Sequence, residues 1–471
     1  MNDTILYSFL GFLALFLFIG LLSIRKRQKT ADDYLLASRG ISPVFVGLSG
    51  AATTASGFGF TGIIGFGYVM GLSGAWFVCG IIFGSLIGFA LTAKRFRLFS
   101  QRQKCVSYSE FLTAGMDLKS RALPLLIAFA TIFAVILYAT AQLTAGSKAL
   151  HVLFGWHYNI GAILGAVIVL LYCWAGGIRA SIWTDVAQII VMYVAMTILM
   201  IVSLGQIGGF AGLYDSLATI DPNLVSMMPQ GNPLGPLLFI AGCLSVGLSF
   251  IGFPHVMVRF MTLKRPKDTM RAIGWYELSY SAFYITAYIV ALCTRVLVDA
   301  GEGFDNELAL AQLSLDLLPD ILVGVVLAGI FAGTISTADS LVLSCTATLS
   351  CDVFRKYKNS YMFLKTSTFA VTLVALMIAI FGSKSVFDLV LFVIAIMGAG
   401  FAPLLIVRVM KWPVGEFAAL GMIVAGLAAA IIWRLEGLHK YVFDSLPGMA
   451  LAFAAYVVIV FVKGGFKRLR A

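Results

Sequence analysis

Long apolar runs, separated by short loops that hold most of the charges, limit what this chain can fold into. The first run, from Ile5 to Ile24, is about as long as the ~20 helical residues that cross a bilayer core. The whole chain is 60% hydrophobic and only 12% charged. This pattern predicts an all-α polytopic membrane protein with about 13 transmembrane helices. No basic leader precedes the first run, so we expect it to be retained as a helix.

The net charge of +11 does not indicate a nucleic-acid partner, because the basic residues lie in alternate loops. The basic clusters lie at 25–29, 94–104, 119–121, 179, 264–271, 355–358, 408–411 and 463–470. The positive-inside rule then predicts a plasma (inner) membrane protein with its N-terminus outside and its C-terminus in the cytoplasm. The connections 208–236 and 298–320 are expected to be outside loops. The seven cysteines are scattered singly, which argues against a disulfide framework or a zinc site.

A polar stripe interrupts the apolar segment around Gly329–Leu341. Gly333, Ser336, Thr337 and Ser340 have the spacing i, i+3, i+4 and i+7, which places them on one face of a helix. Asp339 lies beside them, and an acid at that depth needs an ion, water or a charged partner. The stripe therefore predicts oxygen ligands for a monovalent cation. The alternative is that small residues simply allow close helix packing.

Two predicted spans contain helix-breaking residues. The span 41–70 is rich in glycine, and the span 237–262 contains Gly252 and Pro254. Carbonyls freed at such breaks persist in a membrane where they line a cavity or bind something. The two spans are five apart, which indicates an inverted repeat with a central binding site. The predicted single domain 1–471 comprises an extra N-terminal helix (1–29), two five-helix repeats (41–207 and 236–411) and two C-terminal helices (412–471).

Other polar residues also lie inside predicted spans. Asp185 is a candidate ion ligand, with an ion pair to Arg179 or a helix cap as the alternative. We expect His255 to be a structural hydrogen-bonding residue. Glu277 and Arg295 are expected to extend to opposite interfaces.

These residues stand among motifs that occur in the same order in a known family. The motifs are Asp33-Tyr34, Arg39-Gly40, the run from Leu48-Ser49 to Ser56-Gly57, Gly176-Gly177, Trp183-Thr184-Asp185, Gly252-Phe253-Pro254-His255, Arg259-Phe260, and Ser336-Thr337 with Ser340. In these features the chain resembles the sodium:solute symporters, and within them the bacterial proline-transporting branch.

The resemblance implies a five-plus-five helix core that binds Na⁺ between its first and eighth helices. The implied sodium ligands are the carbonyls of Ala52, Ala55 and Gly333 and the hydroxyls of Ser336 and Thr337. Some members have a second sodium site, which would map to Asp185, Asp339 and Ser340. Where the proline-transporting branch has an acid beside its sodium site, this chain has Thr54.

The resemblance also implies a solute pocket that is small, apolar and aromatic. Its predicted residues are Thr53, Gly57, Phe58, Tyr138, Gln142, Val246 and Phe250. A small amino acid such as proline is the favoured solute, followed by a short monocarboxylate.

The predicted function is therefore sodium-driven symport of a small organic solute by alternating access, within the lipid bilayer. Proton coupling through Asp185 or Asp339, and a transporter-like membrane sensor, remain as alternatives. An enzyme is not indicated, because no constellation of nucleophile and base is recognisable. No obligate protein partner is evident from the sequence.

Overall fold

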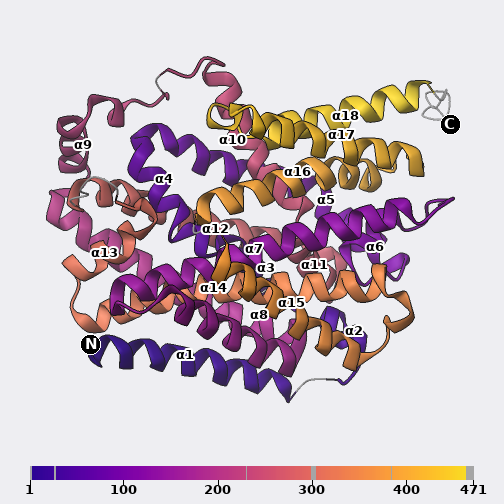
Figure 1. Cartoon of the computed structure of the whole chain (residues 1–471), viewed down its shortest axis with the longest axis horizontal. Coiled ribbons are helices and arrows are strands. Elements are labelled where there is room, and N and C mark those ends of the chain that lie inside the picture. Colours follow the sequence, from indigo (N-terminus) through magenta and orange to yellow (C-terminus); the bar gives the residue numbers. More distant parts are fainter. Residues whose placement is uncertain (1–2, 26–27, 230, 299–303, 383–384, 463–471) are drawn as a thin grey trace.

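The computed structural model is a bundle of helices (Figure 1) that describes residues 3–25, 28–229, 231–298, 304–382 and 385–462. The helices are α1 (Asp3–Ile24), α2 (Ala31–Leu36), α3 (Pro43–Ala55), α4 (Gly62–Met70), α5 (Ala75–Arg102), α6 (Tyr108–Thr113), α7 (Ala122–Phe154), α8 (Tyr158–Ile207), α9 (Gly209–Ile220), α10 (Pro236–Leu248), α11 (Pro254–Met261), α12 (Thr269–Leu297), α13 (Ala309–Leu317), α14 (Asp320–Thr348), α15 (Tyr361–Phe381), α16 (Val386–Val409), α17 (Glu416–Leu435) and α18 (Ser445–Val462). The basic residues at 26–27, Lys384 and the basic tail from 463 lie outside the described residues.

The all-α membrane fold is confirmed. Within the described residues, nine helical segments are long and apolar enough to cross a membrane, or ten if the bent pair α10 and α11 is one span. Shorter apolar helices at 43–55, 158–171 and 445–461 coincide with other predicted spans. The total of about 13 spans and the repeat boundaries stay predictions.

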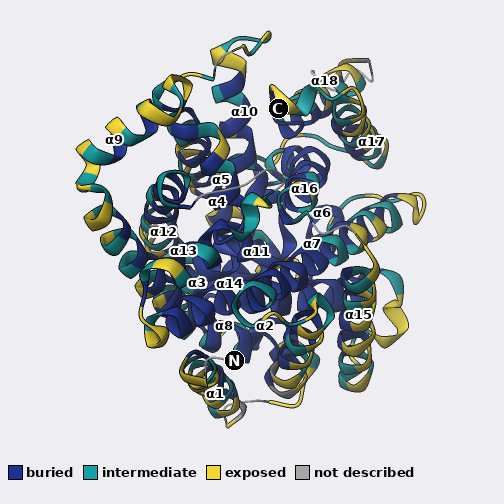
Figure 2. Ribbon diagram, turned by 60° about the vertical axis from the view of Figure 1, so that its left-hand side comes forward, coloured by how far each residue is buried: buried dark blue, intermediate teal, exposed yellow. Residues whose placement is uncertain are grey.

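The α14 helix forms the centre of the bundle, and every residue from Val323 to Thr348 is buried (Figure 2). Small residues let neighbouring helices approach it closely. A Cβ at Gly329 would lie 2.8 Å from the Ala195 side chain of α8, and one at Gly333 would lie 3.0 Å from the Ser56 carbonyl oxygen. The polar stripe of α14 is therefore held directly against other backbones.

The glycine-rich span breaks where α3 ends. Ser56 has a φ of +54°, and a short 3-10 turn (Gly57–Gly59) separates α3 from α4. The Ser56 hydroxyl accepts a hydrogen bond from the Phe58 amide at 3.1 Å, which helps to compensate for lost helical bonding. This break lies against the middle of α14.

The second break separates α10 from α11, which are bent by 53° at the turn Ser249–Gly252. Pro254 begins α11, where its missing amide hydrogen costs nothing. A Cβ at Gly252 would lie only 2.3 Å from the Met397 carbonyl oxygen of α16, so a close approach requires glycine there. Both predicted breaks therefore occur.

Two further predicted spans meet inside α8. The spans predicted at 160–175 and 182–207, with a turn near Arg179 between them, are joined at a kink, because Gly177 has a non-helical backbone conformation (φ +58°). Glycine is needed there because a Cβ would lie 2.5 Å from the Tyr34 carbonyl oxygen. The expected outside loops contain the helices α9 and α13.

Candidate functional site

Hydroxyls of α14 face backbone carbonyls at the end of α3. The Ser336 hydroxyl donates to the Ala52 carbonyl at 3.2 Å, and the Thr337 hydroxyl donates to the Thr53 carbonyl at 2.7 Å. Both hydroxyls also lie 3.1 Å from the Gly333 carbonyl. Ala52, Thr53, Gly333, Ser336 and Thr337 are all buried. The result is a compact cluster of oxygen atoms without a nitrogen ligand, the donor set that a hard cation prefers.

The fifth predicted sodium ligand points elsewhere. The Ala55 carbonyl accepts a hydrogen bond of 3.0 Å from the Tyr284 hydroxyl of α12. The Thr54 hydroxyl also turns away from the oxygen cluster and donates to the Gly50 carbonyl of its own helix at 2.8 Å. The structure thus brings four of the five predicted sodium ligands together and separates Ala55 from them.

Asp185 is paired with Arg259. Nη2 of Arg259 lies 2.9 Å from Oδ2 of Asp185, and the Ser49 hydroxyl donates to the same carboxylate oxygen at 2.6 Å. The interpretation that Asp185 pairs with Arg179 is wrong, because Arg179 lies 2.5 Å from the Asp33 carboxylate instead. Arg179 and Asp185 both belong to α8, but their partners come from two other helices, α2 and α11.

Asp339 and Ser340 adjoin this ion pair on α14. Oδ1 of Asp339 accepts hydrogen bonds from the Ser340 hydroxyl at 2.7 Å and from the Ser181 hydroxyl at 2.9 Å. The Arg259 guanidinium also donates to the Ser340 hydroxyl. The Thr53 hydroxyl lies 3.4 Å from Ser340, which links this group to the oxygen cluster. Thr53, predicted as a solute residue, therefore lies among the ion-site residues.

Two side chains of α7 bind the break at the end of α3. The Gln142 side-chain oxygen accepts a hydrogen bond from the Gly57 amide at 2.8 Å. The Tyr138 hydroxyl donates to the Ser56 hydroxyl at 3.4 Å. The structure therefore brings three of the predicted solute residues, Gly57, Tyr138 and Gln142, to one place.

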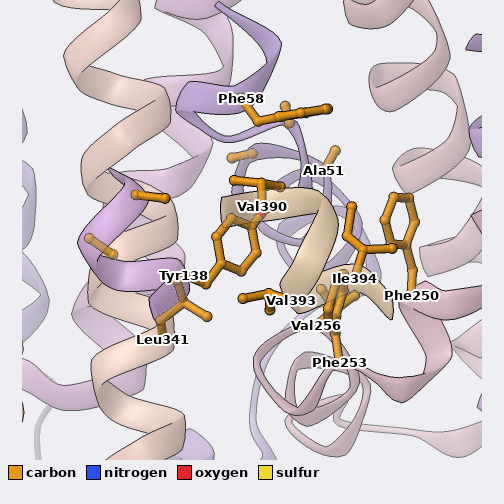
Figure 3. Packing of buried hydrophobic residues seen from close by; sticks show 14 of the residues in the cluster. Ala51, Phe58, Tyr138, Phe250, Phe253, Val256, Leu341, Val390, Val393 and Ile394 are labelled. Atoms are coloured by element: carbon orange, nitrogen blue, oxygen red, sulfur yellow. The ribbon is translucent and has the colours of Figure 1, made fainter. Parts of the chain in front are cut away.

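Aromatic rings surround this place (Figure 3). Phe58 stacks on Phe387 of α16 with 5.6 Å between ring centroids. Below it, Tyr138 lies 6.0 Å from Phe253, which stacks on Phe250 at 5.6 Å. Val246 is also buried, but on α10, whose main neighbours are α5, α16 and α18. Val246 is the predicted solute residue with the least direct relation to the break.

Two structural expectations differ from what is observed. The His255 ring packs 5.1 Å from Phe253 and 5.7 Å from Tyr138, and neither ring nitrogen has a hydrogen-bond partner among the described residues. Glu277 does not extend to the interface, because it is half-buried and accepts a hydrogen bond of 3.0 Å from the Ser85 hydroxyl of α5.

Sequence reasoning missed the part that Arg259, Ser49 and Ser181 play in the site. Arg259 carried a usable signal, since a cation in an apolar run needs a buried acid or an interface. The two serines carried none, because serine is common where membrane helices pack closely.

Comparisons with known proteins agree with this architecture. A family model described as "Sodium:solute symporter family" matches residues 34–426. The osmoregulated proline transporter OpuE of Bacillus subtilis (strain 168) is 26% identical over 92% of this chain and 90% of its own length. The sodium/proline symporter of Escherichia coli (strain K12) is 26% identical over 98% of this chain and 93% of its own length.

Solved structures share the fold. A Na⁺-coupled sialic acid symporter superposes with a TM-score of 0.83 at 20% identity and covers 98% of both chains. The transporter Mhp1 of the nucleobase-cation-symport-1 family superposes with a TM-score of 0.58 at 16% identity, over 91% of this chain and 95% of its own. The family match covers most of the sequence and both of its broken helices. The chain therefore belongs to the sodium:solute symporter family and is a membrane transporter that couples the movement of a small solute to sodium.

Proposed function

We propose that this transporter imports a proline-like amino acid together with sodium, with a short monocarboxylate as the next candidate solute. The relatives described as proline transporters support the solute class. The observation that carries the proposal is the break at Ser56 and Gly57, which two polar side chains of α7 bind from an otherwise aromatic surrounding.

The sodium ion would be held between α3 and α14. The proposed ligands are the carbonyls of Ala52, Ala55 and Gly333 and the hydroxyls of Ser336 and Thr337. Their oxygen chemistry fits sodium, and carbonyls at a helix break are typical ligands for this ion. For Ala55 to join, the carbonyl would have to exchange the Tyr284 hydroxyl for the ion. Sodium would supply the positive charge that draws the two helices together.

The solute would lie beside the break. Its apolar ring would contact Phe58, Tyr138 and Phe250, whose rings form the surrounding surface. Its carboxylate would face the N-terminus of α4 at Gly62, because unpaired amides and the helix dipole favour a negative charge there. Gln142 would hold the broken segment in position beside the solute, because its side-chain oxygen accepts a hydrogen bond from the Gly57 amide.

Coupling would follow from the shared backbone. The sodium ion and the solute would both bind the segment from Ala52 to Phe58, so sodium bound on one side of the break would order the other side. One sodium ion crossing ~100 mV yields ~2.3 kcal/mol, and a tenfold concentration gradient adds ~1.4 kcal/mol. Together they would support solute accumulation of roughly a few hundredfold.

The loop charges support a location in the plasma membrane with the N-terminus outside and the C-terminus inside. In this orientation Phe387 covers the solute residues on the outer side, and the Arg259 ion pair closes the inner side. Alternating access would then require these two closures to open in turn.

The test is uptake of labelled proline into proteoliposomes at fixed membrane potential, with an inward sodium gradient or with choline replacing sodium. We expect accumulation only with the sodium gradient. Uptake that follows an inward proton gradient in the absence of sodium would contradict sodium coupling. If proline is not taken up, labelled lactate and acetate test the monocarboxylate alternative under the same two conditions.

A further inference from the structure

The residues of the expected second sodium site already surround a cation that belongs to the protein. Nη2 of Arg259 lies 2.9 Å from Oδ2 of Asp185 and 3.4 Å from the Ser181 hydroxyl, and it also donates to the Ser340 hydroxyl. A sodium ion bound by Ser340 would use the same hydroxyl oxygen. The second oxygen of Asp185 has no hydrogen-bond partner among the described residues, but an ion bound there would lie on a carboxylate that the guanidinium already neutralises. A second unit charge within ~4 Å of the guanidinium in this buried position would be strongly repelled. The residues present therefore do not fit a second sodium ion.

The remaining contacts of Arg259 hold the guanidinium in place. Its Nε donates to the Ser49 hydroxyl of α3 at 2.7 Å, and its Nη1 donates to the His255 carbonyl of α11 at 2.5 Å. Arg259 is 1% exposed, so water does not replace these partners. The side chain thus connects α11 with α3, α8 and α14, and two of these helices, α3 and α14, carry the proposed sodium ligands.

The balance of buried charges leads to the same conclusion. In the described interior where these helices meet, the formal charges are two carboxylates, Asp185 and Asp339, and one guanidinium, Arg259. One sodium ion would make this group neutral. Two would leave an excess positive charge in a medium where an uncompensated charge is costly. Thr54, where the proline-transporting branch has an acid, adds no charge and faces Gly50.

We propose that Arg259 takes the place of a second sodium ion, so that one sodium ion accompanies each solute molecule. This inference rests on the proposed sodium site between α3 and α14. Asp339 supplies the negative charge that balances the single ion, through Ser340 and Thr53. Arg259 is a positioning residue here and does not contact the solute.

Equilibrium binding of ²²Na⁺ to the purified transporter tests the stoichiometry. We expect one ion per wild-type chain and a Hill coefficient near one. Arg259→Met keeps the length of the side chain and removes its charge, so we expect a second bound ion and a steeper sodium dependence. Arg259→Lys, which keeps the charge, is the matched control and should still bind one ion. Two ions bound to the wild type would overturn the inference.

Further measurements distinguish the possible failures. Asp185→Asn in the Arg259→Met background should remove the second ion, and an unchanged count of two would contradict the assignment of that site to Asp185. If Arg259→Met does not fold, the reversal potential of wild-type proteoliposomes gives the number of charges that move with each solute molecule. One charge per solute molecule supports the inference, and two charges overturn it. No sodium bound to the wild type would instead contradict the underlying sodium site.

A separate observation concerns a basic pocket at the ends of α5 and α16. A cavity of about 450 Å³ is lined by the side chains of Arg95, Arg102 and Lys411, and its apolar walls are Leu98, Phe99, Val409 and Met410. The three cations are exposed, and none forms an ion pair within the described residues.

The surroundings of this basic pocket indicate a membrane interface. Leu91 and Leu98 of α5 are 47% and 36% exposed, so this helix presents apolar side chains beside the cations. Trp412, which is 44% exposed, follows α16 at the same end, and tryptophan is typical of the interface. Basic pockets between membrane helices on the cytoplasmic side favour anionic head groups. The geometry points to a site for the phosphate of an anionic phospholipid, with its acyl chains along Leu91 and Leu98.

Native mass spectrometry after exchange into phosphatidylglycerol or phosphatidylcholine tests this site. We expect retained phosphatidylglycerol on the wild type and at least a fivefold loss in the triple variant Arg95→Gln, Arg102→Gln, Lys411→Gln. The control Lys264→Gln, Arg265→Gln, Lys267→Gln removes the same charge from an exposed loop and should retain the lipid. Equal retention by both triple variants would overturn the proposal, as would displacement of the lipid by millimolar inorganic phosphate.

Discussion

The Arg259 guanidinium donates a 2.9 Å hydrogen bond to the Asp185 carboxylate across 74 residues of chain. Both side chains are almost completely buried, at 2% and 0% exposed. A buried ion pair of this kind adds little net stability but is costly to break from one side only. Its effect is to fix the inner half of the second broken helix, α11, against the helices that carry the proposed ion ligands.

Thr337→Ala is expected to raise the sodium concentration for half-maximal uptake. The variant removes a hydroxyl that lies between the Thr53 and Gly333 carbonyls. If the lost hydroxyl contributes about 1.4 kcal/mol to the free energy of sodium binding, the sodium affinity becomes tenfold weaker. Sodium titration of proline uptake measures this shift. Thr348→Ala is the matched control, because that hydroxyl bonds only within α14, to the Ser344 carbonyl. An unchanged sodium dependence in Thr337→Ala would contradict the proposed site.

Phe58→Leu is expected to weaken solute binding with little effect on sodium. The ring stacks on Phe387 and forms part of the surface proposed to contact the solute. We expect KM for proline to rise by about fivefold, because the smaller side chain would lose ~1 kcal/mol of apolar contact with the solute. Phe89→Leu, a buried ring packed on Phe260 and Tyr276, is the control. If both variants change KM equally, the effect is one of general packing and not of solute contact.

Gly57→Ala tests how closely the break approaches α14. The added Cβ would lie 2.6 Å from Cγ2 of Thr334 and 3.0 Å from the Ala145 side chain. We expect a destabilisation of about 1–3 kcal/mol, measured as a lower unfolding temperature, and loss of transport. Thr334→Ser removes Cγ2 and should restore part of the stability in the double variant. Gly274→Ala meets nothing within 4 Å and should behave as wild type. Absence of any rescue by Thr334→Ser would show that the clash is not the cause.

Lys148→Met is expected to lower the thermal stability of the protein, because Lys148 holds together segments on the side predicted to face outside. Lys148 lies 2.6 Å from both Asp305 and Glu307, and Glu307 accepts hydrogen bonds from the amides of Val386 and Phe387. Removing the cation leaves the Asp305 and Glu307 carboxylates close together without a compensating charge, which should lower the free energy of unfolding by about 3 kcal/mol. Thermal unfolding should therefore occur at lower temperature, whereas Lys148→Arg should preserve most of the stability. Equal stability of Lys148→Met and wild type would contradict this account.

The membrane helices and their breaks were predictable because they depend on local composition. Apolar runs are as long as the bilayer requires, and glycine or proline stands where a backbone must bend or approach another closely. The stripe of Ser336 and Thr337 was also predictable from helical spacing alone. These features need no knowledge of which helices are neighbours.

The partner of Asp185 was not predictable in this way. Arg179 is close in sequence, and Arg259 is close only after α8 and α11 have packed together. The direction of the Ala55 carbonyl likewise depends on Tyr284 of a distant helix. Ligand sets that combine several helices therefore need tertiary structure, even where each residue type is suggestive.

The hydrogen bonds from Ser336 and Thr337 to the carbonyls of Ala52 and Thr53 bear on turnover. When an ion leaves such a site, any buried carbonyl without a donor would retard its departure. Of these two carbonyls, that of Ala52 is a proposed sodium ligand, and the Ser336 hydroxyl is in place to replace the ion there, so dissociation exchanges one partner for another. A site built in this way favours rapid exchange over tight retention, which is what a carrier that must release its ion in every cycle requires.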